Sequence, residues 1–363
     1  MRLTVTVLPG DGIGPEVTAQ AERVLDAIGD AFGHTFVRKV QPIGGAAIHR
    51  TGTPLPDATL KACLAGDAVF LGAVGDPAFD RLRPEERPEA GLLRLRTALG
   101  GFANLRPART DPALVDATPY RPEKVQGADV LVVRELLGGL YFGSPRGATS
   151  DRAYNTMSYT RDEVARVARV GFEQARQRRR FVTSVDKANV LETSQLWRST
   201  VTEIARAYPD VRLEHMYVDA CAMRLAVEPR RFDVILTENL FGDILSDQAA
   251  ALAGSIGMLP SATIGGRVDL YEPVHGSAPD IAGTNRANPF GAIASVSMLL
   301  RQTAHLSREA DLVDTAIRGV LDMGYRPADL AAGGRVSSTT EIGDAVIAAL
   351  AELIDYQHAY HAV

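Results

Sequence analysis

Between residues 160 and 237 the sequence alternates between helical and strand patterns, and this alternation limits the possible folds more than any other feature. Helices are expected at about 160–178, 194–208 and 222–227, and strands at 181–185, 212–218 and 232–237. A helix after each strand returns the chain to the same end of a sheet, which builds βαβ units. The sequence therefore predicts an α/β fold, a sheet with helices on its faces.

The remaining segments extend this pattern on both sides. Apolar strands are expected at 3–8, 68–74, 129–134 and near Leu270, and closing helices at about 290–304, 308–323 and 341–355. The chain has 363 residues, which is enough for two domains, and it shows no repeat and no obvious linker. We therefore expect two domains that share the sheet, the chain leaving one domain and later returning to it.

A glycine-rich turn follows the first strand. Residues 9–16 read Pro-Gly-Asp-Gly-Ile-Gly-Pro-Glu. The spacing is G-x-G-x-G rather than G-x-G-x-x-G, and Pro15 suits the first position of a helix rather than the end of a dinucleotide motif. The segment gives only weak support for a Rossmann phosphate loop and is better interpreted as a tight strand-to-helix turn near a ligand.

Charge and cysteine content exclude several classes of protein. The formal net charge of −5 and the sequence pI of about 5.9 argue against general attraction to nucleic acid or to an anionic membrane. Cys63 and Cys221 form neither a disulfide framework nor a CxxC metal site. The N-terminus resembles a short strand rather than a signal peptide, and no apolar run approaches the roughly 20 residues of a membrane span. We expect a cytoplasmic protein that binds neither nucleic acid nor membrane.

Two aspartates lie four residues apart in the segment Asn-Leu-Phe-Gly-Asp-Ile-Leu-Ser-Asp (239–247). If this segment begins a helix, Asp243 and Asp247 share one face. They then form either an N-terminal turn whose acids complement the helix dipole, or part of an oxygen-ligand site for Mg²⁺ or Mn²⁺. The segment alone leaves both interpretations open.

Further candidates lie where apolar elements end. Arg96, Arg106 and Arg134 would bind a small di- or tricarboxylate if they converge, although each alone is an ordinary surface or ion-pair arginine. Lys187 follows a predicted strand, where α/β proteins place ligands, and either acts as a general base or caps a loop. Asp219 also follows a strand, and it supplies either another metal oxygen or a helix N-cap.

The segment from Glu272 to Pro289 is a polar loop rich in glycine and proline between apolar stretches. It is too elaborate for a simple connection, and its backbone could wrap an adenosine. Asp280 could accept a hydrogen bond from a ribose 2′-hydroxyl, as acidic residues do in NAD sites, whereas a 2′-phosphate would require basic residues. His275 taken alone is more often structural.

Taken together, these segments resemble the isopropylmalate and isocitrate dehydrogenase family of β-decarboxylating dehydrogenases, and they are most similar to its isopropylmalate branch. The resemblance covers nearly the whole chain, from Leu8 to Ala345. The segments that carry it are Leu-Pro-Gly-Asp-Gly-Ile-Gly-Pro-Glu (8–16), Arg-Pro-Glu-Ala-Gly-Leu-Leu (87–93), Phe-Ala-Asn-Leu-Arg-Pro (102–107), Asp-Lys-Ala-Asn-Val-Leu (186–191) and His-Gly-Ser-Ala-Pro-Asp-Ile-Ala-Gly (275–283).

The resemblance implies NAD-dependent oxidative decarboxylation of 3-isopropylmalate to 2-oxo-4-methylpentanoate, a step of leucine biosynthesis, with Mg²⁺ or Mn²⁺. Lys187 would help to remove the proton of the C2 hydroxyl, and Tyr141 would protonate the enol left after CO₂ departs. The implied substrate contacts are Arg96, Arg106, Arg134, Asp219, Leu92, Leu93 and Val190, and the implied metal ligands are Asp219, Asp243 and Asp247.

The resemblance also implies the site of NAD. Asp280 would bind the adenosine ribose, and Glu89 would border both the cofactor and the pocket for the isopropyl group. The other implied NAD contacts are Ile13, Asn189, His275, Gly276, Ser277, Ala278, Ala287 and Asn288.

Family resemblance further implies an architecture and a partner. Two domains would share a continuous mixed sheet flanked by helices, which is not a Rossmann fold. The first domain (1–101 plus 254–363) would carry the NAD-binding loops, and the second (102–253) the metal aspartates, a dimerisation surface and an arm near 135–159. Members are homodimers with shared active sites, so Lys187 and Asp219 would act in the partner's site.

Three positions depart from the family pattern without removing a catalytic group. Gly101 replaces a bulkier apolar residue, Ala220-Cys221 stands where Asn-Ala is common, and Gln248 stands where an acid is common. These departures leave open a relaxed or shifted side-chain pocket, and two alternatives to the implied function are kept. One is the same chemistry on another 2-hydroxy acid, such as another alkylmalate, tartrate, homoisocitrate or isocitrate. The other is a non-catalytic regulatory relative.

Overall fold

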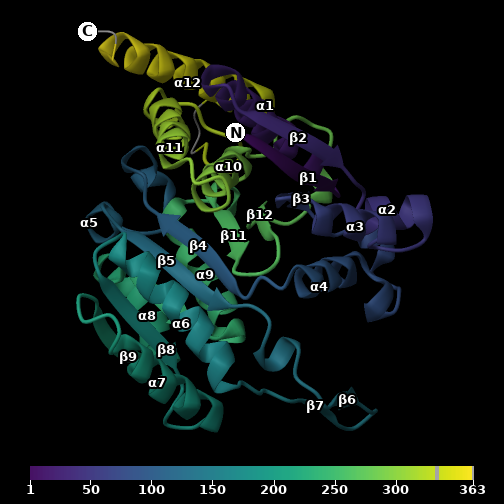
Figure 1. Ribbon diagram of the computed structural model, residues 1–363, viewed down its shortest axis with the longest axis vertical. Coiled ribbons are helices and arrows are strands. Elements are labelled where there is room, and N and C mark those ends of the chain that lie inside the picture. Colours follow the sequence, from purple (N-terminus) through teal and green to yellow (C-terminus); the bar gives the residue numbers. More distant parts are fainter. Residues whose placement is uncertain (332–334, 362–363) are drawn as a thin grey trace. The chain divides into compact units, whose positions relative to one another are not determined.

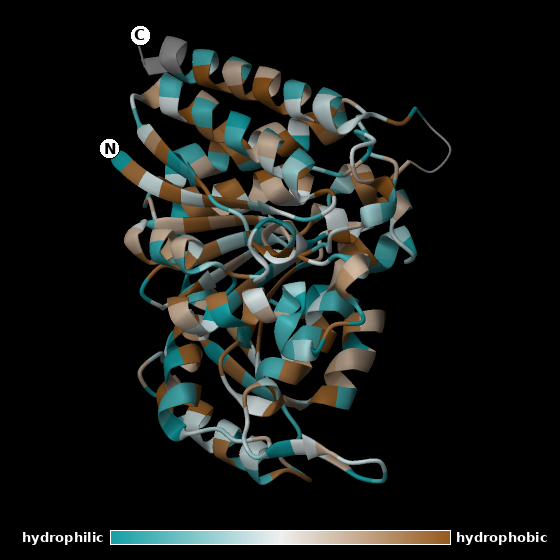
Figure 2. Cartoon of the chain, turned by 90° about the vertical axis from the view of Figure 1, so that its right-hand side faces the viewer, coloured by the Kyte–Doolittle hydropathy of each residue, from teal (hydrophilic) through white to brown (hydrophobic). Residues whose placement is uncertain are grey.

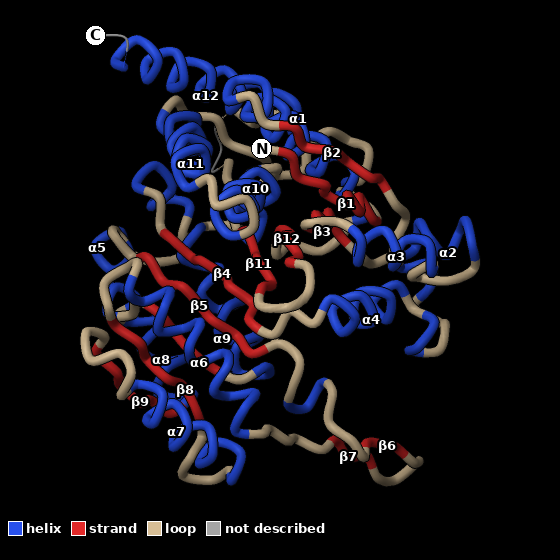
Figure 3. The backbone as a smooth tube through the Cα atoms, in the orientation of Figure 1, coloured by secondary structure: helices blue, strands red, loops and turns tan. Residues whose placement is uncertain are grey.

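The computed structural model describes residues 1–331 and 335–361 and divides the chain into two compact units (Figure 1). Unit 1 contains Met1–Gly101 and Ser255–Val363, and unit 2 contains Phe102–Gly254. Each unit has strands covered by helices, which confirms the predicted mixed α/β fold (Figure 3). Over the described residues, no helix has the length and apolar character needed to cross a bilayer.

The sheet of unit 1 has the strand order β2-β1-β3-β12-β11. It is parallel except at its last strand, where β11 runs antiparallel to β12. The expected strands at 3–8, at 68–74 and near Leu270 are confirmed. The strand bounds are Arg2–Gly10 for β1, Thr35–Val40 for β2, Ala68–Ala73 for β3, Pro260–Ile264 for β11 and Asp269–Pro273 for β12.

Two groups of helices cover this sheet. Helices α1 (Gly14–Phe32), α10 (Phe290–Gln302), α11 (Ser307–Asp322) and α12 (Thr339–His361) pack on one another, and the three closing helices agree with those predicted. Helices α3 (Asp57–Ala65) and α4 (Pro88–Leu99) enclose an apolar core with the strands, to which Ile43 contributes just before α2 (Gly44–Thr51). Figure 2 shows hydrophobic and hydrophilic residues interleaved along the helices, as expected for helices with one buried face.

The main sheet of unit 2 has the strand order β4-β5-β10-β8-β9. β4 is antiparallel to β5, and the other neighbouring strands are parallel. All four strands predicted for this region are confirmed. The bounds are Ala103–Arg109 for β4, Asp129–Glu135 for β5, Phe181–Asp186 for β8, Arg212–Tyr217 for β9 and Val234–Thr237 for β10.

Helices α6 (Arg161–Arg176) and α7 (Glu192–Ala205) pack together on this sheet, as do α8 (Val218–Val227) and α9 (Asn239–Ala250), with the short α5 at Pro122–Val125. The connections through α7 and α8 cross the sheet in opposite directions, so right-handed crossovers place these helices on opposite faces. A capping box begins α6, in which the side chains of Thr160 and Glu163 each accept a hydrogen bond from the backbone N–H of the other residue. Strands β6 (Arg146–Ala148) and β7 (Ala153–Asn155) form an exposed hairpin that projects from the rest of unit 2 (Figures 1 and 3).

Candidate active site

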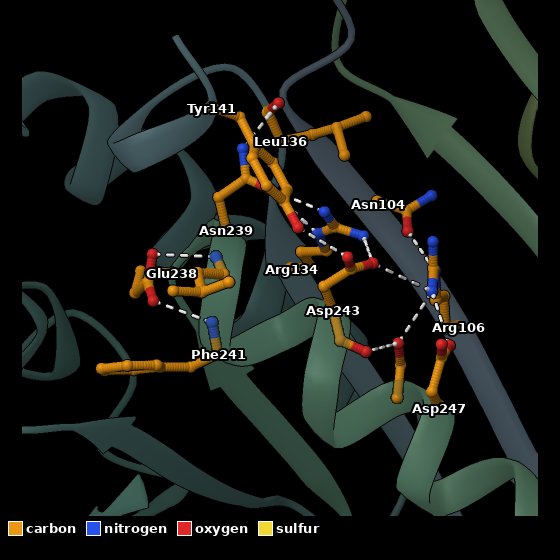
Figure 4. Close-up of polar contacts among 12 residues, drawn as sticks. Asn104, Arg106, Arg134, Leu136, Tyr141, Glu238, Asn239, Phe241, Asp243 and Asp247 are labelled. Atoms are coloured by element: carbon orange, nitrogen blue, oxygen red, sulfur yellow. Dashed lines mark hydrogen bonds and ion pairs between the residues drawn. The ribbon is translucent and has the colours of Figure 1, made fainter. Parts of the chain in front are cut away.

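Helix α9 presents two aspartates one turn apart. The helix begins after Glu238, whose carboxylate accepts hydrogen bonds from the backbone N–H of Leu240 at 3.0 Å and of Phe241 at 2.8 Å. Asp243 and Asp247 therefore lie on one face, as the sequence predicts. Figure 4 shows both carboxylates beside arginine side chains.

Arg106 and Arg134 bring positive charge to these aspartates from adjacent strands. Arg134 on β5 is buried and forms an ion pair with Asp243. The Nη1 atom of Arg106 on β4 lies 3.7 Å from Oδ1 of Asp243 and 3.4 Å from Oδ1 of Asp247. Arg134 pairs with Asn104 across the two strands, and Asn104 is two residues before Arg106, so both arginines project from the same face of the sheet. The structure thus brings two of the three predicted carboxylate-binding arginines together.

Tyr141 is held against the same carboxylate. Its hydroxyl donates a hydrogen bond to Oδ2 of Asp243 at 2.7 Å, and Cζ of Arg134 lies 5.6 Å from its ring centroid. Burial, reinforced by the hydrogen bond to Asp243, raises the pKa of Tyr141 above its ordinary value. The phenol is therefore protonated at neutral pH and can act as a proton donor.

The two aspartates differ in their electrostatic environment. Burial favours a higher pKa for Asp243, but Arg134, Tyr141 and Arg106 outweigh it, and the pKa of Asp243 is lowered. Burial raises the pKa of Asp247, with Arg106 opposing this effect and the neighbouring Asp243 adding to it. One or two carboxylates, completed by substrate oxygens and water, are the usual ligands of Mg²⁺. Asp243 and Asp247 therefore fit a divalent cation.

Lys187 and Asp219 form a separate charged pair in unit 2. Lys187 follows β8, and its Nζ donates to Oδ1 of Asp219 in the first turn of α8, which lowers the pKa of Asp219. The N-cap of α8 is Tyr217, so the interpretation of Asp219 as an N-cap is wrong. In the part of the chain that the structure describes, no three His, Cys, Asp or Glu side chains are grouped to hold a metal ion. Within one chain, Asp219 therefore does not join Asp243 and Asp247.

In unit 1 the predicted cofactor loop packs against the glycine-rich turn. The backbone N–H of Ile13 donates to the carbonyl of Ser277 at 2.8 Å, and a Cβ on Gly12 would collide with that carbonyl. Glu16, in the first turn of α1, accepts a hydrogen bond from the backbone N–H of Asn285 at 3.1 Å. The glycine spacing therefore permits close backbone packing against the loop, which agrees with a tight turn rather than a dinucleotide motif.

His275 is a buried polar group at the start of this loop. Burial lowers its pKa, so the imidazole is neutral at pH 7. Its Nδ1 lies 2.8 Å from the carbonyl oxygen of Gly276, which makes Nδ1 the protonated nitrogen. Its Nε2 is buried and has no hydrogen-bond partner among the described residues. A buried acceptor of this kind fits a polar group of a bound ligand.

Helix α4 carries the third arginine and two of the apolar candidates. Arg96 is mostly buried and forms an ion pair with Glu272 at 2.6 Å, while its Nε has no partner among the described residues. Leu92 packs against the core of unit 1, whereas the side chain of Leu93 is exposed. Val190, in unit 2, is also exposed. Of the three apolar residues predicted to contact the substrate, Leu93 and Val190 therefore have exposed side chains.

Two residues of α9 that contact the arginines were not singled out by sequence reasoning. Asn239 accepts hydrogen bonds from Nε of Arg134 at 3.0 Å and from Nη2 at 2.8 Å. Ser246 accepts one from Nη1 of Arg106 at 2.8 Å. These residues lie four positions before and three positions after Asp243, so helical periodicity alone would have placed them on its face.

The structure gives a reason for two of the three departures from the family pattern, Gly101 and Gln248. A Cβ on Gly101 would collide with the methyl group of Thr263, so a larger residue there requires Thr263 to shift. Cys221 is fully buried in the core. The side-chain amide of Gln248 donates to the carbonyl of Ala222 at 2.6 Å and ties α9 to α8, a bond that a carboxylate cannot donate.

Comparisons with known proteins agree with this geometry. The isocitrate/isopropylmalate dehydrogenase family model matches residues 4–346. A 3-isopropylmalate dehydrogenase of Salinibacter ruber is 56% identical over 333 residues, 92% of this chain and 91% of that protein. One from Nitratidesulfovibrio vulgaris is 56% identical over 353 residues, 95% and 99% of the two chains. The crystal structure of isocitrate dehydrogenase from Methylococcus capsulatus has a TM-score of 0.85 at 36% identity and covers 96% of this chain and 99% of that one. The chain therefore belongs to the isocitrate/isopropylmalate dehydrogenase family.

Proposed function

We propose that this protein catalyses the NAD-dependent oxidative decarboxylation of 3-isopropylmalate to 2-oxo-4-methylpentanoate, a step of leucine biosynthesis. The observation that carries the proposal is the cluster in unit 2 in which Arg106, Arg134 and Tyr141 all contact Asp243 or Asp247. The cluster combines two arginines that can bind a carboxylate, a tyrosine that can donate a proton and two aspartates that can bind a metal ion. The proposed reaction needs all of these groups.

In the proposed reaction, Nζ of Lys187 accepts the proton of the C2 hydroxyl, and bound NAD would supply the acceptor for the hydride that leaves C2. The resulting β-keto acid loses the carboxylate on C3 as CO₂, and the electron pair of the broken bond forms the C2–C3 double bond of an enolate, whose negative charge lies on the C2 oxygen. Tyr141 then donates its phenolic proton to C3. Arg96, Arg106 and Arg134 bind the two substrate carboxylates through bidentate guanidinium hydrogen bonds.

Asp243 and Asp247 would hold Mg²⁺ or Mn²⁺, with Asp219 of the partner subunit as a third ligand. Such a cation would supply Lewis-acid polarisation of the substrate's C2 oxygen. His275 and Asp280 would bind the adenosine part of NAD, a role supported by the unpartnered Nε2 of His275.

We propose that the protein acts as a homodimer whose active sites combine residues of both subunits. Support comes from exposed apolar side chains on the paired helices α8 and α9, namely Met223, Val227 and Ile244. Met223 and Val227 are four residues apart and share one face of α8. Since Asp219 does not join Asp243 and Asp247 within one chain, Asp219 would reach the cation only as a residue of the second chain.

We propose a cytoplasmic location. Cys63 and Cys221 are both free and buried, and burial raises the pKa of each thiol to about 12. Unpaired thiols are typical of proteins from reducing compartments.

The experiment that tests the function is a substrate panel with NAD and Mg²⁺. NADH formation and CO₂ release are measured with 3-isopropylmalate, isocitrate, homoisocitrate, tartrate and malate. We expect 3-isopropylmalate to have the highest kcat/KM. Absence of its turnover would refute the substrate, turnover of another acid would identify the alternative, and no turnover at all would favour a regulatory relative.

A further inference from the structure

Asn239 has every hydrogen-bonding position of its side chain in use. Its Oδ1 accepts from Nε and Nη2 of Arg134, and its Nδ2 donates to the carbonyls of Leu136 at 3.1 Å and Gly138 at 3.0 Å. The residue is fully buried at the first position of α9. An amide has two acceptor sites and two donor hydrogens, so the four bonds together fix its orientation.

These four bonds join two parts of the candidate active site. The acceptor side fixes the plane of the Arg134 guanidinium, whose Nη1 reaches Asp243. The donor side anchors the turn at 136–138, which leads directly into the short helix Gly139–Tyr141 and so to the phenol (Figure 4). One side chain thus sets the position of both an arginine and a proton donor.

Asn239 lies within a network of buried hydrogen bonds. The hydroxyl of Tyr159 accepts from the backbone N–H of Asn239 and donates to Oε2 of Glu238, both at 3.1 Å. From the other side, Glu135 accepts from the backbone N–H of Leu137 at 3.0 Å, and it is fully buried. Such a connected, satisfied and buried network holds its members in one arrangement.

The close approach of α9 to β5 supports the same arrangement. Gly242 lies one turn before Ser246, and a Cβ on it would collide with the aliphatic part of Arg134. Because this position has no side chain, the helix can lie close enough for Asn239 to reach the guanidinium.

We propose that Asn239 is a positioning residue, which orients Arg134 for the substrate carboxylate and holds the 136–138 turn that places Tyr141 for proton donation. The inference rests on the proposed function, since it takes Arg134 as a carboxylate ligand and Tyr141 as the acid. Asn239 itself touches neither the substrate nor the cofactor in this mechanism.

The two halves of the amide can be tested separately. Asn239→Asp keeps acceptor oxygen for Arg134 but replaces the two donors with an oxygen that faces the carbonyls of Leu136 and Gly138. We expect kcat to fall by about 100-fold, as small misplacements of a catalytic group do, while KM changes by less than about 3-fold. Asn239→Ala removes both the acceptor oxygen and the donor nitrogen. Because Arg134 then also loses its acceptor, KM should rise by about 10-fold in addition to the fall in kcat.

Thr110→Val is the matched control. Thr110 is also buried in unit 2, and its hydroxyl donates to the carbonyl of Leu252 at 2.7 Å. It lies six residues from Asn104 along the β4 direction, or about 20 Å at the usual rise of a strand. Loss of its hydrogen bond should lower Tm without changing kcat or KM. If Asn239→Asp lowers only Tm, as this control does, the positioning role is refuted.

Amide hydrogen exchange of residues 136–141 in the full-length protein gives a readout that needs no substrate. Exchange there should become at least about 10-fold faster in Asn239→Asp and stay unchanged in Thr110→Val. Unchanged exchange in Asn239→Asp would overturn the inference. The kinetic comparison works with any 2-hydroxy acid that the wild type oxidises, so the proposed substrate and the role of Asn239 can fail independently.

Discussion

Individual side chains in unit 2 show how burial changes the chemistry of an acid. Glu135 is fully buried, accepts hydrogen bonds from the backbone N–H groups of Leu137 and Gly138, and lies 3.6 Å from Arg166. Burial outweighs these favourable contacts and raises the pKa of Glu135 from 4.5 to about 7. The group therefore changes its charge near neutral pH in the folded protein only.

This shift makes stability depend on pH. Between pH 4.5 and about 7 folded Glu135 keeps a proton that the unfolded chain has lost, so its stabilising contribution is complete below pH 4.5 and disappears as the pH rises to about 7. The loss corresponds to about 3 kcal/mol in the free energy of unfolding. Glu135→Gln should remove this dependence on pH. Urea unfolding of the wild type and the variant across this pH range measures how their free energies of unfolding differ. A difference that is independent of pH would contradict the prediction.

Asp280 provides a second test at the scale of one residue. It is exposed in the predicted cofactor loop, where its charge should repel the 2′-phosphate of NADP. We expect kcat/KM to be at least about 100-fold higher with NAD than with NADP, and Asp280→Asn to narrow this ratio by about 10-fold. Asp322→Asn, at an exposed acid that ends α11, is the control and should leave the ratio unchanged. Similar kcat/KM values for the two cofactors in the wild type would refute the assignment.

The long sequence motifs identified which side chains could bind or react. They did not show which of these side chains contact one another. Asp243, Asp247 and the arginines were identifiable by type and spacing. That Arg134 pairs with Asp243, while Arg96 pairs with Glu272, depends on strand register and helix packing that no local pattern specifies. The role of Asn239 was missed for the same reason, because its partners lie about a hundred residues away.

At the scale of elements, helices α8 and α9 form a linked pair. Gln248 joins α9 to α8 through the carbonyl of Ala222, and the pair exposes Met223 and Val227 on one side of α8. Exposed apolar residues grouped on paired helices are typical of a protein interface. The sequence analysis considered α9 only as a possible helix, and it began α8 four residues late, at 222, after a strand expected to reach 218. The helix in fact begins at Val218.

A single charge on this pair should separate the subunits. Met223, with 58% of its surface exposed, would be buried in the proposed dimer, so Met223→Asp should shift the protein from dimer to monomer because an unpaired charge would be buried. Met323→Asp is the control. It changes a residue of unit 1 that is 62% exposed, and the sedimenting particle should keep the mass of a dimer. Sedimentation of both variants measures the effect. A dimer that survives Met223→Asp would exclude this face as the interface.

At the scale of the whole molecule, the proposed shared site predicts complementation between inactive variants. Lys187→Ala removes the proposed base from one subunit, and Asp243→Asn removes a metal ligand from the other. If each site combines Lys187 of one subunit with Asp243 of its partner, a mixed dimer has one intact site. Dimers re-formed at random from equal amounts should then recover about a quarter of the wild-type activity.

Each variant is re-formed alone as the control and should stay inactive. The same experiment with Lys187→Ala and Asp219→Asn, two changes assigned to the same side of the site, should recover nothing, because neither site of that mixed dimer is complete. Recovery by the second pair but not by the first would refute the proposed division of residues between subunits.

The α/β architecture followed from the alternation of elements, since period and length distinguish strands from helices. Strand order did not follow, because β10 lies between β5 and β8 through connections that leave no local signal. The position of Asp219 apart from Asp243 and Asp247 in a single chain was implied by family resemblance alone. Sequence spacing cannot distinguish contacts within a chain from contacts between chains.

The discontinuity of unit 1 affects how the protein is made. During synthesis β3 emerges from the ribosome early. The neighbouring strand β12 emerges only after all of Phe102–Gly254 has been synthesised. Until then the nascent chain carries an unpaired strand edge, which is open to pairing with other chains. All the strands of unit 2, by contrast, leave the exit tunnel in one continuous stretch. A message truncated after Gly254 would therefore yield a chain whose β3 has lost one neighbour permanently, which favours aggregation.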